Sequence, residues 1–180
     1  MSFGHLGALA ANTGYDRAVD LDLPDGFTGN YYVFVSTGGP FEFIHDDNNT
    51  RQSNNFTIEL TPPPDLIVSE ISPLKDTLQE GSLLDIRWSV RNAGNGNAGG
   101  AWIDSLFLEP AGNPGAANVP LGSFAYEAGL EAGKTYTRTE AFQLPTHING
   151  LYRVVVRTNA DGRLYENAAT DNNTLRSDLS

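Results

Sequence analysis

The sequence predicts an all-β chain: an immunoglobulin-like antiparallel β-sandwich of about seven strands, preceded by a partial second module of the same type. Apolar and polar residues alternate along several short segments, most clearly over residues 84–91, as in strands with one buried face. Turn-forming residues separate these segments, since the 180 residues include 19 Gly and 10 Pro. The strand pattern at residues 150–158 also occurs, in a second copy, at residues 29–37.

The two copies of this strand lie 121 residues apart (150 − 29 = 121), and the match continues toward the N-terminus without a gap. Repetition at a long fixed period indicates an array of similar modules. We therefore interpret residues 1–60 as the C-terminal half of a first immunoglobulin-like module, so that residues 2–11 belong to a module and not to a leader. The matched pairs include Ser2–Phe3 with Ser123–Phe124, Leu23–Pro24 with Leu144–Pro145 and, at a shorter offset (172 − 54 = 118), Asn54–Asn55 with Asn172–Asn173.

A run of prolines divides the chain. The consecutive prolines within residues 61–64 favour a stiff, extended segment, so this stretch is predicted to be a linker. The complete module is predicted over residues 65–180, with its first strand over residues 65–71. Trp88 lies on the following strand, over residues 84–91, and is predicted to anchor the core.

The rest of the complete module is predicted as strands joined by turns, beginning with a glycine- and asparagine-rich turn at residues 92–100. Pro120 and Gly122 interrupt one strand, which is therefore expected to lie at a sheet edge or to carry a bulge. Tyr152, and Tyr31 in the first copy, are expected to be structural, each holding the corner before its strand. The remaining strands are predicted at residues 102–108, 119–126, 136–144, 150–158 and 174–179.

The composition excludes several classes of function. The formal net charge of −11 argues against binding to nucleic acid, which needs clustered cations. No apolar run approaches the roughly 18 residues of a membrane span, so membrane insertion is not expected. The chain has no cysteine, and the G-x-S-x-G and H-E-x-x-H patterns are absent from its sequence. The chain is therefore not predicted to be an enzyme.

Several short segments of the complete module follow one another in a specific order. Each segment is common by itself, but their order and spacing together are characteristic. The segments are Pro64–Val68, Val90–Asn95, Trp102–Leu108, Gly150-x-Tyr152, Tyr165–Glu166 and Asn172–Asn173.

In this order the segments resemble the CARDB family, the cell-adhesion-related domain found in bacteria. The resemblance covers residues 64–176 in full and residues 2–60 as the second half of a preceding copy. It implies a non-catalytic, tandem immunoglobulin-like module of a large bacterial surface or secreted protein, acting as a structural spacer and in cell adhesion. The alternative that it implies is an accessory module that binds a glycan or calcium beside a secreted enzyme. The first copy departs from the pattern, with His45 where the complete copy has Glu166, and it lacks the first four strands.

Calcium is the metal for which the sequence offers ligand types. Oxygen-bearing residues with a glycine turn gather near the last hairpin, which is what calcium requires. However, the full calcium-loop pattern is missing, and the first copy has Gly38, Pro40, His45 and Ser53 at the matching positions. No metal or cofactor is therefore expected, and calcium stays an alternative. The candidate ligands are Asn159, Asp161, Glu166 and Asp171.

Two further assignments concern asparagine and tryptophan. The asparagine pair occurs in both copies, as Asn54–Asn55 and Asn172–Asn173, and is expected to be structural because Asn side chains cap nearby backbone groups. Trp102 follows a glycine-rich loop and is the candidate for a glycan contact.

The partners follow from the tandem interpretation. Neighbouring repeat modules are expected, in a protein that is extracellular or on the cell surface. Half a sandwich would leave an apolar face uncovered, including Tyr31, Val33 and Val35. We expect this N-terminal half to pack against the same segment of another copy, giving a homodimer.

Overall fold

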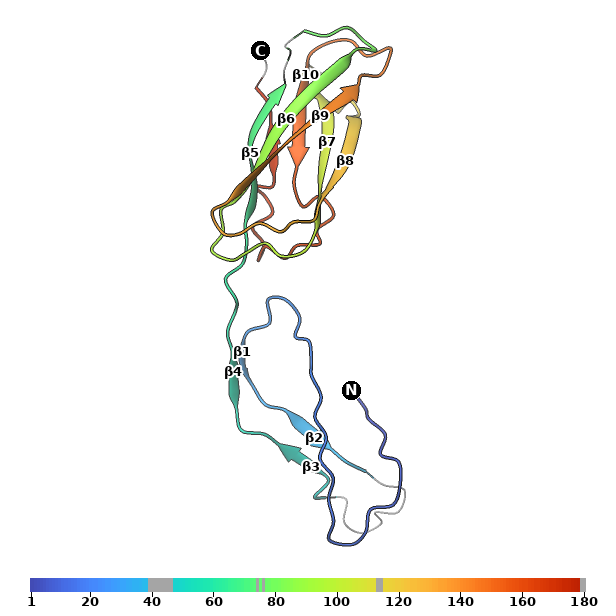
Figure 1. Ribbon diagram of the computed structural model, residues 1–180, viewed down its shortest axis with the longest axis vertical. Helices are drawn as coiled ribbons and strands as arrows, with labels where there is room; N and C mark the ends of the chain where they lie inside the picture. The colour runs from blue at the N-terminus through green and yellow to red at the C-terminus, as the bar shows by residue number, and fades with distance from the viewer. Residues whose placement is uncertain (39–46, 74, 76, 113–114, 179–180) are drawn as a thin grey trace.

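The computed structural model describes residues 1–38, 47–73, 75, 77–112 and 115–178. Across these residues the chain forms strands and turns without any helix, so none of them forms a helix that could cross a membrane. The sandwich lies at one end of the molecule, a narrow pair of small sheets at the other, and an extended segment joins them (Figure 1). The all-β fold class is thus confirmed.

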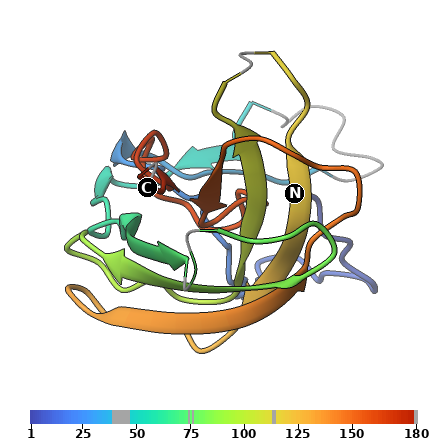
Figure 2. The ribbon, with the colours of Figure 1, turned by 90° about the horizontal axis from the view of Figure 1, so that it is seen from above.

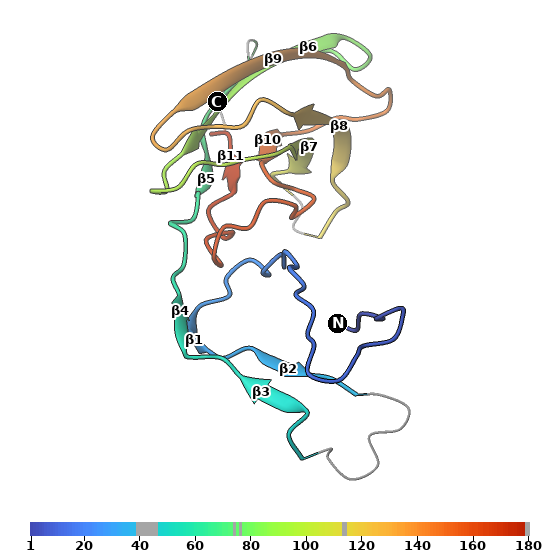
Figure 3. The same cartoon turned by 60° about the horizontal axis from the view of Figure 1, so that its bottom comes forward.

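Seven strands build the sandwich, as predicted. One antiparallel sheet has the order β5-β6-β9 and the other has the order β11-β10-β7-β8, and the two sheets face each other as separate layers (Figures 2 and 3). These strands are β5 (Leu66–Pro73), β6 (Leu83–Asn92), β7 (Trp102–Pro110), β8 (Val119–Tyr126), β9 (Thr135–Gln143), β10 (Tyr152–Arg157) and β11 (Thr174–Arg176).

The alternation of apolar and polar residues in the sequence corresponds to an alternation of buried and exposed side chains in the structure. Along β6, every second side chain from Leu84 to Val90 is buried, whereas Arg87 and Arg91 are exposed. The interrupted strand is also where it was expected, since β8 is an edge strand whose pairing with β7 shifts register between Leu106 and Phe107. Proline and glycine weaken the ladder there because one lacks an N–H and the other lacks a side chain.

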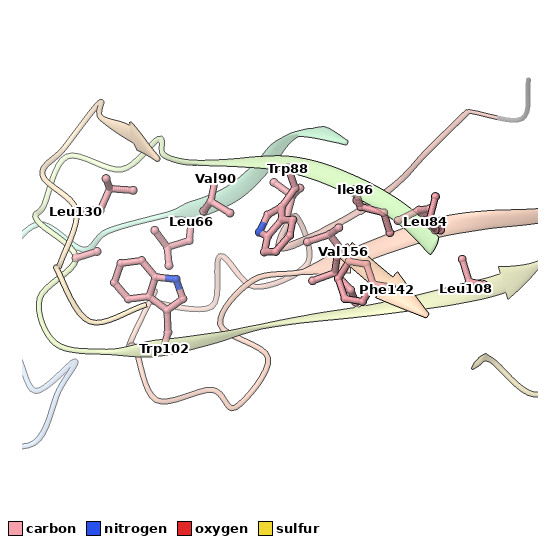
Figure 4. Close-up of a cluster of buried hydrophobic side chains, with 14 of the residues drawn as sticks. Leu66, Leu84, Ile86, Trp88, Val90, Trp102, Leu108, Leu130, Phe142 and Val156 are labelled. Atoms are coloured by element: carbon pink, nitrogen blue, oxygen red, sulfur yellow. The ribbon is translucent and has the colours of Figure 1, made fainter. Parts of the chain in front are cut away.

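Trp88 lies at the centre of the core and is 0% exposed. It packs between the sheets with apolar side chains from both layers (Figure 4). Burying one large apolar side chain contributes about 1.5–3 kcal/mol, so a core of this size can hold the sandwich together without disulfides. Its labelled members are Leu66, Leu84, Ile86, Val90, Trp102, Leu108, Leu130, Phe142 and Val156.

A polar cluster is buried within this apolar core. Asp104 Oδ2 accepts hydrogen bonds from Trp88 Nε1 at 2.8 Å and from the Tyr136 hydroxyl at 2.7 Å. Trp102 Nε1 donates in turn to the Tyr136 hydroxyl at 3.1 Å. Burial raises the pKa of the Asp104 carboxyl above its usual range, although these hydrogen bonds and the charge of Arg138 lower it in part. The cluster joins β6 and β9 of one sheet to β7 of the other.

The Asp104→Asn variant is expected to gain stability relative to the wild type as pH rises from about 3 to 7. Folding raises the pKa of Asp104, so above its unfolded value near 3.8 the native state holds the proton more tightly than the unfolded state does. Rising pH therefore lowers the wild-type free energy of unfolding through this group, and asparagine removes the effect while keeping an acceptor for Trp88 and Tyr136. Urea unfolding of both proteins across this pH range measures the difference; a constant difference would contradict the assignment.

The N-terminal half consists of a few short strands. The strands β1 (Gly29–Tyr31) and β4 (Phe56–Ile58) pair with each other, as do β2 (Phe34–Ser36) and β3 (Thr50–Gln52), and residues 1–28 contain no strand. Residues 1–28 include the positions that match part of β8 and all of β9 in the repeat, so these two strands of the complete copy do not form there. Among the described residues no sheet opposes these strands, so their side chains are mostly exposed, and strands form only where the hairpin pairs with itself.

The two copies agree in one turn and differ in strand register. The turn before the repeated strand has similar backbone in both copies, with φ of 75° at Gly26 and 65° at His147. By contrast, Val155 pairs with Arg176, whereas Phe34, which matches Val155 in sequence, pairs with Gln52. Register is set by a buried face, which the N-terminal half lacks. That residues 1–60 are part of a preceding module thus remains a prediction.

Candidate functional site at the start of β5

The chain enters the sandwich at the end that faces the N-terminal half (Figure 1). Three of the segments that carry the family resemblance, around Asn92, Glu166 and Asn173, meet there at the first residues of β5. Their convergence was not predicted, because the sequence places them far apart along the chain. The one hint of their proximity was that all three residues belong to the segments of the family pattern.

Asn92 forms the first half of this site. Its side chain is fully buried, and Oδ1 accepts from the backbone N–H groups of Asp65 and Gly94, both at 3.1 Å. Nδ2 donates to the carbonyl oxygens of Gly96 at 2.8 Å and Leu130 at 3.0 Å. The carbonyl and the N–H₂ group of this side chain are thus both hydrogen-bonded, as a buried amide requires. The side chain links the start of β5 to the glycine-rich turn.

Glu166 forms the second half. It is 2% exposed, and Oε2 accepts from the backbone N–H of Leu66 at 2.6 Å. Oε1 accepts from Asn159 Nδ2 at 2.6 Å and from Asn173 Nδ2 at 2.7 Å. The ion pairs found among the described residues do not involve Glu166. Amide donors therefore stabilise this buried carboxylate, and the bonds fasten the first strand to the last hairpin.

Two more contacts complete the arrangement. Asn172 Nδ2 donates to the Asp65 carboxylate at 2.9 Å on the surface of the site. Asn159 has a left-handed φ of 46° and exchanges hydrogen bonds with the backbone of Leu164, which fixes the turn that carries it. We name the set the β5 clamp, comprising Asn92, Asn159, Glu166, Asn172 and Asn173.

The linker is seated beside the clamp. Gly96 N donates to the Pro63 carbonyl at 3.1 Å, so the linker backbone lies directly on the glycine-rich turn. A Cβ atom added at Gly96 would lie 1.7 Å from the carbonyl oxygen of Pro62, and one added at Gly94 would lie 2.6 Å from that of Pro63. Glycine is required at both positions because any side chain would displace the linker.

The structure brings two of the calcium candidates together, but as hydrogen-bond partners. Asn159 donates to Glu166, and its own oxygen accepts from Leu164. Asp161 has other partners, since Oδ1 accepts from the backbone N–H of Ile103 at 3.4 Å and Oδ2 lies 3.1 Å from Arg163 Nε, and Asp171 is exposed. Within the described part of the chain, no three acidic, histidine or cysteine side chains form a group that could hold a metal ion.

Excess calcium is expected to shift the melting temperature of the chain by very little. A ligand stabilises a fold only when it binds the folded state preferentially, and the oxygens of Asn159 and Glu166 already have partners. Thermal melts with and without millimolar calcium test this expectation. A rise of several degrees that Asp161→Ala abolishes would contradict it.

The tryptophan and tyrosine candidates have these places in the fold. Trp102 is 1% exposed and its ring packs 4.9 Å from that of Tyr126, so no ring face is open to a sugar. This burial argues against the glycan contact that the sequence suggested, and packing against Tyr126 and Tyr136 accounts for it. Tyr152 packs half-buried against the core, and the Tyr31 hydroxyl donates to the Thr28 carbonyl at 2.9 Å.

The asparagine pairs differ between the two halves. Asn172 and Asn173 belong to the β5 clamp, whereas Asn54 and Asn55 are exposed in the segment between β3 and β4. Among the described residues of the N-terminal half, no strand corresponds to β5, so Asn54 and Asn55 have no such strand to hold in this structure. The sequence matches Glu166 to His45, which lies outside the described residues, as does Pro40.

Comparisons with known proteins give one family and several similar structures. No curated protein matches the chain. Among solved structures, the chain resembles the CARDB domain of a Pyrococcus furiosus protein. The crystal structure of that domain, in complex with di-metal ions, is 18% identical, with a TM-score of 0.48 over 65% of this chain and 87% of that one. Its solution NMR structure is 19% identical, with a TM-score of 0.48 over 67% and 96% of the two chains.

A more distant likeness is to a Listeria innocua β-glucosidase in complex with glucose, at 20% identity and a TM-score of 0.37, over 54% of this chain and 14% of the enzyme. The family comparison is more direct. The CARDB family profile matches residues 63–176, which is more than half of the chain. The matched range includes the glycine-rich turn that contacts the linker, the β5 clamp and the whole sandwich. The chain therefore belongs to the CARDB family.

Proposed function

We propose that this chain is a non-catalytic structural module of a large bacterial surface or secreted protein, acting as a spacer and in cell adhesion outside the cell. One observation carries the proposal: hydrogen bonds fasten the linker and the first residues of β5 to the sandwich, and the bond from Leu66 to Glu166 is buried. Family membership supports the role of an immunoglobulin-like structural module.

A spacer must pass orientation and load from one module to the next through its junction. Here the prolines stiffen the approaching chain, and the glycine-rich turn takes up its backbone. Pulling on the linker would act on the bonds that Asp65 and Leu66 make with Asn92 and Glu166 before it could strip β5 from β6. Buried bonds of this kind are costly to break because the separated groups are not immediately solvated.

The rigidity of the junction can be measured as a distance distribution. The chain has no cysteine, so spin labels can be attached at Arg51→Cys in β3 and Arg87→Cys in β6, both exposed positions. We expect one narrow distribution in the parent protein. Gly96→Val should broaden it because the linker loses its seat, whereas Gly99→Val is the matched control, since a Cβ at Gly99 meets no atom within 4 Å. A broad distribution in the parent protein would overturn the proposal.

A groove at the opposite end of the sandwich favours the second candidate function, an accessory module that binds a ligand such as a glycan. The groove has a volume of about 810 Å³, within the size range of small-molecule sites. The residues that line it include Leu84, Leu108, Tyr152, Val154 and Asp178. Binding of the protein to a glycan array would favour this function over the spacer if Tyr152→Ala abolishes the binding. If no glycan on the array is bound, the spacer remains the favoured function.

The N-terminal half further supports the proposal of a homodimer. Phe34 and Val35 are 63% and 64% exposed on β2, and among the described residues both strands of each small sheet are edge strands. We expect light scattering at micromolar concentration to give twice the mass of the chain, and Phe34→Asp to restore the monomer. A monomeric mass for the unmodified protein would contradict the homodimer. The exposed face of β2 would then be covered by another surface or remain in contact with water.

A further inference from the structure

The N-terminal half approaches the sandwich at a second point besides the linker. The turn that contains Gly26 lies against the ring of Tyr165. A Cβ atom added at Gly26 would lie 2.3 Å from the Tyr165 hydroxyl oxygen and 2.9 Å from Cζ. Both distances are shorter than the closest approach of a real Cβ atom, so a side chain at position 26 and the ring in its present place exclude each other.

The ring is attached to the end of the sandwich that holds the β5 clamp. Tyr165 directly precedes Glu166, and its hydroxyl donates to Asn167 Oδ1 at 2.9 Å. Asn167 has a left-handed φ of 48°, so the backbone around it has a specific, non-extended course. Tyr165 is 37% exposed, so part of it remains accessible to a neighbouring surface.

The turn that meets this ring is also ordered by its own contacts. Phe27 N donates to the Pro24 carbonyl at 3.2 Å, and the Phe27 ring stacks on Tyr31 with 4.3 Å between centroids. The linker and the segment after Tyr165 border a common cleft of about 440 Å³, lined by Pro62, Pro63 and Asn167 among others. The linker and the turn therefore touch the sandwich at two separate points.

The chain contains its own comparison for this turn. His147 matches Gly26 in the repeat and has nearly the same backbone, with φ of 65° against 75°. The same turn can thus be built with a side chain, and glycine is not required by the backbone alone. What distinguishes Gly26 is the ring of Tyr165, since His147 lies at the opposite end of the sandwich, in the loop beside the groove.

We propose that Gly26 and Tyr165 form a docking contact between consecutive modules, in which the end of the sandwich around Tyr165 receives the glycine turn of a preceding CARDB-type module. The residue at this turn position determines whether the docking contact can form. Glycine leaves room for the ring of Tyr165, whereas a histidine side chain would occupy that space. This inference rests on the proposed spacer function and names the surface that fixes the orientation. A single tether leaves two modules free to rotate about it, and a second contact removes that freedom.

The test uses the full chain with spin labels at Arg51→Cys and Arg87→Cys. Gly26→His should widen the distance distribution at least about twofold, because relative motion is the default once an interface is lost. Histidine is suitable because the chain itself places His147 in this backbone conformation. Tyr165→Ala should widen the distribution to a similar extent by removing the ring. His147→Gly is the matched control, at the same turn of the other copy, and should leave the distribution unchanged.

The outcomes separate this contact from the proposed function. If the distribution stays narrow in Gly26→His and Tyr165→Ala but widens in Gly96→Val, the docking contact is wrong and the seated linker alone fixes the junction. If the parent protein already gives a wide distribution, the stiff spacer is wrong, and the docking contact with it. Widening in both variants, with His147→Gly unchanged, supports the contact.

Discussion

Glu166→Ala is expected to lower the free energy of unfolding of the sandwich by about 3–5 kcal/mol. The substitution removes the acceptor of three N–H groups, from Leu66, Asn159 and Asn173, and leaves these donors in a site from which water is excluded. Each unpaired buried donor costs about 1–3 kcal/mol, and partial rearrangement recovers some of it. Because small domains are stable by about 5–15 kcal/mol, this one change should threaten the fold.

Urea unfolding followed by tryptophan fluorescence measures this loss. Glu166→Gln is the matched control, since glutamine keeps the size and one acceptor oxygen but turns an N–H₂ group toward at least one donor. We expect it to lose roughly half as much stability as the alanine variant. A loss below about 1 kcal/mol in Glu166→Ala would mean that the clamp contributes no more than an exposed hydrogen bond.

Trp102→Ala is the second substitution with a large expected effect, about 3–5 kcal/mol of stability. Trp102 is 1% exposed, and its removal would leave a cavity beside the stacked rings of Tyr126 and Tyr136 and strip a donor from the Tyr136 hydroxyl. Trp102→Phe keeps most of the apolar volume and should cost about 1–2 kcal/mol, chiefly the lost hydrogen bond.

The same variants decide what Trp102 does. A surface residue that binds a sugar could be removed with almost no change in stability, whereas a core residue could not. If Trp102→Ala has the same melting temperature as the wild type, Trp102 is not a core residue, and the glycan contact is supported again.

The sandwich could be predicted from the sequence because its strands follow a local rule. The alternation from Leu84 to Val90 and the interruption of β8 at Pro120 each depend on neighbours within one strand, and both have the expected structure. The family pattern was equally accessible, because order and spacing are properties of the sequence itself, and the profile over residues 63–176 confirms it.

The candidate site was harder to predict, because its parts meet only in three dimensions. Asn159 and Glu166 looked like calcium ligands since the side-chain oxygens that bind calcium also accept hydrogen bonds, and only the fold shows that amide donors surround them. Trp102 was the glycan candidate because a glycine-rich loop precedes it, yet its ring packs against Tyr126 and Tyr136. Register in the N-terminal half was not predictable because, without a buried face, alternation does not specify a partner.

Amide hydrogen exchange of Leu66 tests the central claim, that the β5 clamp holds the first strand where the linker arrives. The Leu66 N–H donates to a carboxylate that is 2% exposed, at the position where a strand would ordinarily fray. We predict that this amide exchanges only when the whole sandwich unfolds, with the same free energy as the amides in the middle of β6. Exchange of Leu66 at the rate of a fraying strand end, while β6 remains protected, would contradict the account.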